Sequence, residues 1–118
     1  MATFRATHRH VRISPRKVRP LADLIRGKLA DEALEVLKFQ PHRGARLLEK
    51  VLQSALGSSR DPDHPANRGR AIDAGMVWVS EVTIDGGPIF KRIRPRARGM
   101  AFSIKKRTSH INVSVDTE

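Results

Sequence analysis

The chain has 118 residues, no cysteine, and 23 lysine and arginine residues against 12 acidic ones, so its formal net charge is +11. This length predicts one domain, residues 1–118, with a single hydrophobic core. The lack of cysteine excludes disulfides, thiolate metal sites and thiol catalysis. Such an excess of positive charge favours a polyanion as the partner, and nucleic acid is the first candidate.

The charge is unevenly distributed along the chain. The first 22 residues hold six basic and no acidic residues, whereas residues 23–85 are close to neutral. No acidic residue lies between Asp85 and Asp116, a stretch of thirty residues with eight basic ones. The sequence shows neither a signal-peptide core nor an apolar run of membrane-spanning length. We therefore expect a soluble cytoplasmic protein with a near-neutral body and two cationic segments.

The N-terminal part of the chain predicts a strand followed by a helix. The mixed polarity of residues 4–13 favours a short strand. Ser14 as N-cap and Pro15 at the first helical position are typical of a helix start, and Gly27 supplies the stop. Pro20 lacks a backbone donor and crowds the carbonyl one turn earlier. We therefore expect a kink or a broken first turn there.

Two further helices and a loop follow. Asp31 is expected to cap a short helix that ends near Phe39, and we expect the Phe39 ring to lie in the core. A third helix is predicted over residues 42–58 by one apolar stripe at helical spacing. Residues 59–70 contain two prolines and a glycine and predict a loop. The stripe of the third helix consists of Ala45, Leu48, Val51, Leu52, Ala55 and Leu56.

From Ile72 onward the apolar period changes to two, which predicts two long antiparallel strands. Between them, residues 86–106 form a predicted β-hairpin whose arms join at residues 94–99. At about 3.3 Å per residue, ten residues in each arm reach roughly 30 Å beyond the body. Gly86 and Gly87 indicate a bend where the arms leave the body. The side chains expected on the core face of the first strand are Met76, Trp78, Val82 and Ile84.

Three basic clusters are the candidate nucleic-acid contacts. Arginine dominates the hairpin, and its planar guanidinium grips phosphates bidentately and stacks on bases. The first cluster spans the start of the expected helix, whose N-terminal backbone donors favour phosphate, and the third lies where the hairpin rejoins the body. An ordinary solvated surface is the alternative interpretation of each cluster. The candidates are Arg5, Arg9, Arg12, Arg16, Lys17 and Arg19; Lys91, Arg92, Arg94, Arg96 and Arg98; and Lys105, Lys106, Arg107, Thr108, Ser109 and His110.

Catalytic interpretations find little support in the sequence. Ser109 and His110 are neighbours on a strand, so their side chains point to opposite faces and form no dyad. His8 and His10 share a face of the expected first strand, but no third metal ligand is evident. No glycine-rich phosphate-binding or dinucleotide-binding motif is present. We therefore predict no enzyme activity, no metal and no cofactor.

Several short blocks of the chain form a recognisable series. In order, they are residues 14–19 (SPRKVR), 22–28 (ADLIRGK), 50–55 (KVLQSA), 87–88 (GP), 91–92 (KR), 95–99 (PRARG) and 105–111 (KKRTSHI). Together these blocks resemble the bacterial large-ribosomal-subunit protein L22 family. The resemblance covers nearly the whole chain, and its last two blocks are the most specific. Pro20, Gly57, an expanded loop at 60–70, Met100 and Phe102 depart from the family pattern.

The resemblance implies an α+β fold in which a small three-stranded antiparallel sheet packs on three helices and a long basic β-hairpin protrudes. It implies a structural role in the large ribosomal subunit, with large-subunit ribosomal RNA, neighbouring ribosomal proteins and the nascent peptide as partners. Neither a membrane nor a homo-oligomer is expected. The hairpin tip would line the peptide exit tunnel, through Ile93, Arg94, Pro95, Arg96, Ala97, Arg98 and Gly99.

Two other function classes remain open at this point. Architectural DNA-bending proteins also use basic β-arms with a proline near the tip. Such proteins usually act as dimers with two arms, whereas this chain shows one arm and no obvious apolar dimer face. An RNA-modifying enzyme is the third possibility, but the sequence lacks an acid–base or nucleophile constellation.

Overall fold

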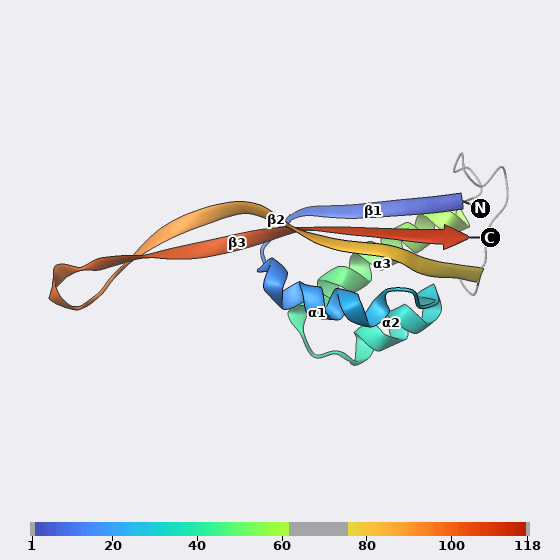
Figure 1. Cartoon of the computed structure of the whole chain (residues 1–118), viewed down its shortest axis with the longest axis horizontal. Coiled ribbons are helices and arrows are strands. Elements are labelled where there is room, and N and C mark those ends of the chain that lie inside the picture. The colour runs from blue at the N-terminus through green and yellow to red at the C-terminus, as the bar shows by residue number, and fades with distance from the viewer. Residues whose placement is uncertain (1, 62–75, 118) are drawn as a thin grey trace.

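The structure, a computed structural model, describes residues 2–61 and 76–117. In it a three-stranded antiparallel sheet of order β1-β3-β2 is covered on one face by three helices (Figure 1). This confirms the predicted α+β architecture. The elements are β1 (Ala2–Val11), α1 (Pro15–Ile25), α2 (Ala30–Phe39), α3 (Arg43–Arg60), β2 (Val77–Pro95), a short 3-10 helix η3 (Ala97–Gly99) and β3 (Ala101–Thr117).

Helix α1 begins as predicted but is not broken by its internal proline. Ser14 occupies the N-cap position without a side-chain cap bond, and Pro15 is at the first position. The helix continues without a break through Pro20, so the expected broken first turn is wrong. Pro20 is exposed, while Val18 and Leu21 on either side of it are buried. The packing of these neighbours offsets the single hydrogen bond that the proline removes.

Helix α2 starts two residues earlier than predicted, and Asp31 is not its cap. Leu29 is the N-cap, and it forms an isolated bridge with Trp78 of β2. Asp31 instead lies in the first turn, where its charge favours the helix dipole. Phe39, expected in the core, is 86% exposed, because α2 turns Ala33 and Leu37 inward.

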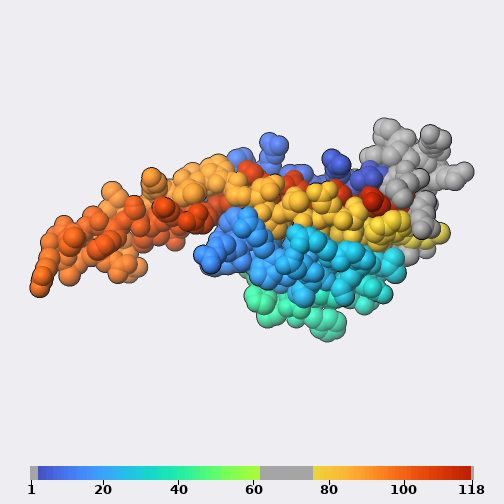
Figure 2. Space-filling view, viewed as in Figure 1, coloured from blue at the N-terminus to red at the C-terminus, as the bar shows by residue number. Residues whose placement is uncertain are grey.

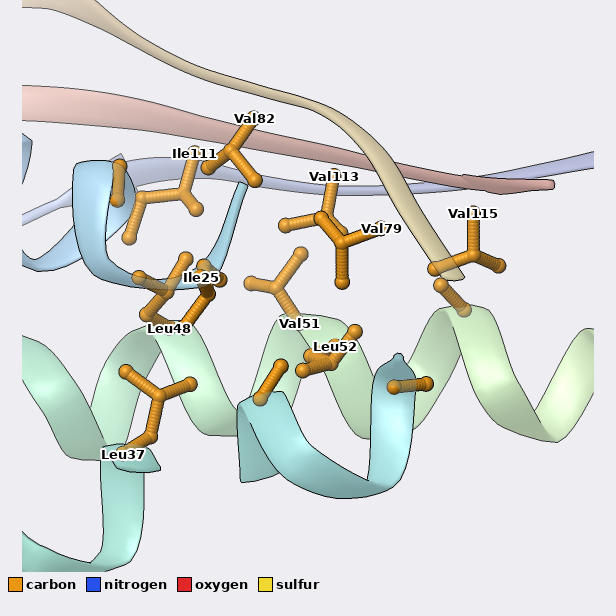
Figure 3. Packing of buried hydrophobic residues seen from close by; sticks show 14 of the residues in the cluster. Ile25, Leu37, Leu48, Val51, Leu52, Val79, Val82, Ile111, Val113 and Val115 are labelled. Atoms are coloured by element: carbon orange, nitrogen blue, oxygen red, sulfur yellow. The ribbon is translucent and has the colours of Figure 1, made fainter. Parts of the chain in front are cut away.

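Helix α3 carries the apolar stripe that its sequence predicts. All six stripe residues are buried, and the helix extends past Gly57 to Arg60 because the stripe continues to the buried Ser59. Leu48, Val51 and Leu52 face the sheet residues Val79 and Val113 in the centre of the core (Figure 3). The loop predicted for residues 59–70 lies mostly outside the described residues.

Strand β2 reaches the core through Val82 and Ile84 as predicted, but through Val77 and Val79 in place of Met76 and Trp78. Its register with β3 shifts between Val79 and Glu81, which makes Ser80 an extra residue in the strand. Because one inserted residue reverses the face on which side chains lie, Val77 and Val79 point inward before the shift. Met76 is 67% exposed and Trp78 only partly buried, so the predicted core positions of both residues are wrong.

The distal parts of β2 and β3 leave the helices and form a free two-stranded ribbon, which we call the hairpin (residues 86–106; Figures 1 and 2). A second register shift, between Gly86 and Ile89, marks its base and confirms the predicted bend. At the tip, Arg98 and Gly99 both have positive φ angles, 62° and 70°. The backbone N–H of Arg96 donates to the carbonyl of Met100 and closes the turn.

Candidate nucleic-acid interface

The hairpin presents its cations to solvent without internal neutralisation. Every residue from Pro88 to Ser103 is exposed. Within residues 2–61 and 76–117, the ion pairs are Arg26 with Asp23 and Arg46 with Glu49, and neither involves the hairpin. Lys91 and Lys105 are even placed directly opposite each other in the register. Like charges in opposed positions destabilise a ribbon, so a bound anion would stabilise this surface.

Basic side chains from five segments meet at the base of the hairpin, around a hollow of about 650 Å³ that we call the junction groove. The segment after β1 provides Arg12, and α1 provides Lys17. Members of all three basic clusters, which are separate in sequence, therefore line one groove. The lining residues are Arg12, Ile13, Ser14, Lys17, Arg43, Phe90, Arg92, Lys105, Lys106, Arg107 and Thr108.

Arg43, at the start of α3, is the functional candidate that the sequence analysis missed. It lines the junction groove, and its guanidinium donates to the carbonyl of Arg12 at 3.0 Å. A signal was present, because a cation in the first turn of a helix opposes the helix dipole and no acidic residue accompanies it there. A residue that costs local stability is a candidate for binding.

A second hollow of about 580 Å³ adjoins the first and shares Ile13, Lys17 and Arg43 with it. It lies between α1 and the α2–α3 connection, with Arg16 on its edge and Leu24 among its apolar residues. The cationic surface therefore continues from the hairpin base along one side of α1.

Three predicted contacts turn inward and hold the hairpin base instead. Thr108 is 3% exposed and its hydroxyl donates to the carbonyl of Pro88 at 2.7 Å. Ser109 is fully buried and its hydroxyl donates to the carbonyl of Ile13 at 2.6 Å. These two hydroxyls are engaged in the fold, so we leave them out of the proposed interface.

His110 is likewise engaged within the fold. Its Nδ1 accepts the backbone N–H of His10 at 3.1 Å, and the two rings meet edge to face at 4.9 Å. His10 has a φ of 57° at an irregularity of β1, whereas His8 borders α3 beside Lys50. The sequence predicted that His8 and His10 share one face of a regular strand, and this prediction is wrong. Within residues 2–61 and 76–117, no group of three or more His, Cys, Asp or Glu side chains could hold a metal.

The remaining N-terminal arginines are not gathered into the groove. Arg5 borders a separate hollow on the sheet with Glu81, and Arg9 is exposed on β1. Arg19 donates through Nε and a terminal nitrogen to the carbonyl of Ile84, at 3.3 and 3.2 Å. Arg19 therefore links α1 to β2 at the base of the hairpin.

None of the helices within residues 2–61 and 76–117 has the length and apolar character needed to cross a bilayer. The groove and the hairpin are exposed features of the described residues. Both offer positively charged, hydrogen-bond-donating side chains, which is the chemistry that binds phosphate.

Comparison with known proteins gives consistent matches over nearly the full chain. The model of the family described as ribosomal protein L22p/L17e matches residues 6–116. The large ribosomal subunit protein uL22 of Rhodopirellula baltica is 56% identical over 115 residues, which cover 98% of this chain and 95% of that protein. The uL22 of Caldicellulosiruptor saccharolyticus is 51% identical over 108 residues, 92% of this chain and 83% of that protein. The uL22 of Desulfotalea psychrophila is 46% identical over 112 residues, 95% and 96% of the two chains.

Proposed function

The chain belongs to the ribosomal protein L22p/L17e family, and we propose that it binds large-subunit ribosomal RNA through the junction groove and the hairpin. As a member of this family it is a structural, non-enzymatic component of the cytoplasmic ribosome. The relatives named above are proteins of the large subunit, and we assign this chain to the same subunit.

The observation that carries the proposal is the unneutralised charge of the hairpin and the groove. The hairpin has seven basic residues and no acidic one, and its opposed lysines repel each other. A two-stranded ribbon is marginally stable in water even without such repulsion. Phosphates on both sides of the ribbon remove the repulsion and hold it extended, so the mechanism is neutralisation combined with wedging between RNA helices.

The shape of the hairpin supports a role for its tip in the nascent-peptide exit tunnel. The ribbon is narrow and projects from one end of the sheet (Figure 2). The turn closed between Arg96 and Met100, which contains two residues with positive φ, gives a compact end. We propose that residues 93–99 form part of the tunnel wall, where they would face the nascent peptide.

The proposal is tested by the salt dependence of binding to large-subunit ribosomal RNA. If about eight side chains engage phosphates, the logarithm of the affinity falls with the logarithm of salt concentration at a slope of about −6. Duplex DNA measured under equal conditions is the comparator, and we expect it to bind more weakly. A slope near −1, or stronger binding to duplex DNA, contradicts the proposal.

A further inference from the structure

Two of the few aromatic rings of the chain lie on the same face of the hairpin. The register pairs Phe90 with Lys106, Arg92 with Ile104 and Arg94 with Phe102. Directly paired residues, and residues two apart on one strand, project from the same face of a ribbon. We call this the ring face, and it consists of Phe90, Arg92, Arg94, Phe102, Ile104 and Lys106.

Each ring on this face is accompanied by an arginine. The guanidinium carbon of Arg92 lies 5.8 Å from the centroid of Phe90, and that of Arg96 lies 5.5 Å from the centroid of Phe102. Both distances fall within the range of cation–π contacts. The rings nevertheless stay open to solvent, with Phe90 45% and Phe102 49% exposed. The arginines therefore orient the rings without covering them.

The position of Phe90 connects the ring face to the cations of the body. Phe90 lines the junction groove together with Arg92, Lys106 and Arg43. An exposed ring surrounded by phosphate-binding groups matches the two parts of a nucleotide, its flat base and its charged backbone. The second ring lies four strand residues farther along the ribbon, at a distance of about 13 Å.

We propose that the ring face binds unpaired bases of RNA by stacking on Phe90 and Phe102, while the adjacent cations hold the flanking phosphates. This inference rests on the proposed RNA-binding function and states what the RNA presents to this face. A base-paired helix hides its base faces within the stack, so it can satisfy the cations but not the rings. An apolar protein surface would cover the rings but leave Arg92 and Arg94 without anions.

The test uses the full chain and two RNA probes with the same number of phosphates, a short unpaired RNA carrying one 2-aminopurine and a fully paired duplex. Replacing Phe90→Leu and Phe102→Leu together keeps the charge and apolar character but removes the rings. We expect affinity for the unpaired RNA to fall about tenfold or more, with the salt slope and duplex affinity unchanged. The quenching of 2-aminopurine on binding should also be lost.

Two control variants separate stacking from an effect on hairpin shape. Phe90→Trp with Phe102→Trp keeps aromatic faces and should retain affinity for the unpaired RNA. Phe39→Leu removes an exposed ring from α2, outside the hairpin and the junction groove, and should leave binding unchanged. An equal loss on both probes, or no loss in the leucine variant, overturns the inference and leaves RNA binding intact. Failure of the unmodified protein to bind either probe overturns the proposed function as well.

Discussion

At the scale of single residues, the base of the hairpin depends on one close approach. A Cβ built on Gly87 would lie 2.4 Å from the hydroxyl oxygen of Thr108, and the same hydroxyl is buried and bonded to the carbonyl of Pro88. Gly86, one residue earlier, has open space at the same position. The two glycines of the bend therefore have different roles, since only Gly87 is required by packing.

We expect Gly87→Ala to destabilise the protein by about 1–3 kcal/mol, because the buried threonine cannot move without losing its hydrogen bond. Gly86→Ala is the matched control and should change stability by less than about 0.5 kcal/mol. Urea denaturation of the purified variants measures both. Equal stability of the two variants would show that the contact between Gly87 and Thr108 is not tight in solution.

Arg43 is the second residue whose importance only its surroundings reveal. We expect Arg43→Ala to weaken binding to large-subunit ribosomal RNA and to reduce the salt slope by about 1, because one phosphate contact is lost. Arg60→Ala is the control, since Arg60 is an exposed arginine at the other end of the same helix. A similar loss in both variants would point to overall charge and not to the junction groove.

At the scale of elements, irregularities in the strands decide which side chains become core. The extra residue at Ser80 turns Val77 and Val79 toward the helices and Met76 toward solvent. The second shift, at the Gly86–Ile89 segment, lies where the ribbon leaves the body. Both shifts occur in β2 and none in its partner β3, which therefore runs as the regular central strand.

The bulge at Ser80 and the alternating sequence pattern lead to opposite expectations about which side chain, Val77 or Met76, tolerates a charge. Val77 is fully buried, so Val77→Asp places an unpaired charge in the core and should cost at least about 3 kcal/mol. Met76→Asp should be tolerated within about 0.5 kcal/mol, because Met76 is exposed. Thermal unfolding followed by circular dichroism compares the two. A larger loss of stability for Met76→Asp than for Val77→Asp would show that the strand follows the simple alternation without the bulge.

At the scale of the whole molecule, the protein separates folding from binding. The helices and the inner half of the sheet bury an apolar core, whereas the hairpin projects from it along the longest axis of the molecule. The extents along the three principal axes are 66, 28 and 15 Å. Because the hairpin residues are exposed, their side chains contribute little to the core. Changes in hairpin charge should therefore affect the ribosome and leave the body folded.

We expect Arg94→Glu combined with Arg96→Glu to impair large-subunit assembly, since two of the charges that we propose to face phosphates are reversed at once. The control is Lys38→Glu with Arg60→Glu, which changes the net charge equally at exposed helical positions. Sucrose-gradient profiles of cells that depend on each variant measure assembly, and thermal unfolding verifies the fold. Normal profiles with unchanged RNA footprints would remove the hairpin tip from the proposed interface.

The amino-acid sequence by itself indicated the type and order of the main helices and strands, the hairpin, and a polyanion as the class of partner. The helical spacing of apolar residues predicts α3, and the proline at the first helical position predicts the start of α1. Both signals are visible in the sequence because they reflect local steric and burial effects. The segment between Asp85 and Asp116 contains basic residues but no acidic ones, and this alone indicates a polyanion as partner.

Only the tertiary structure decided which face each strand buries and which cations act together. The bulge at Ser80 cannot be recognised from a hydrophobic pattern of period two. Phe39 is an apolar residue, but the packing of α2 leaves its ring exposed. Arg43 joins Arg12 and Lys17 because helix packing brings together residues far apart in the chain. Such long-range juxtapositions depend on packing and register, which local sequence patterns do not encode.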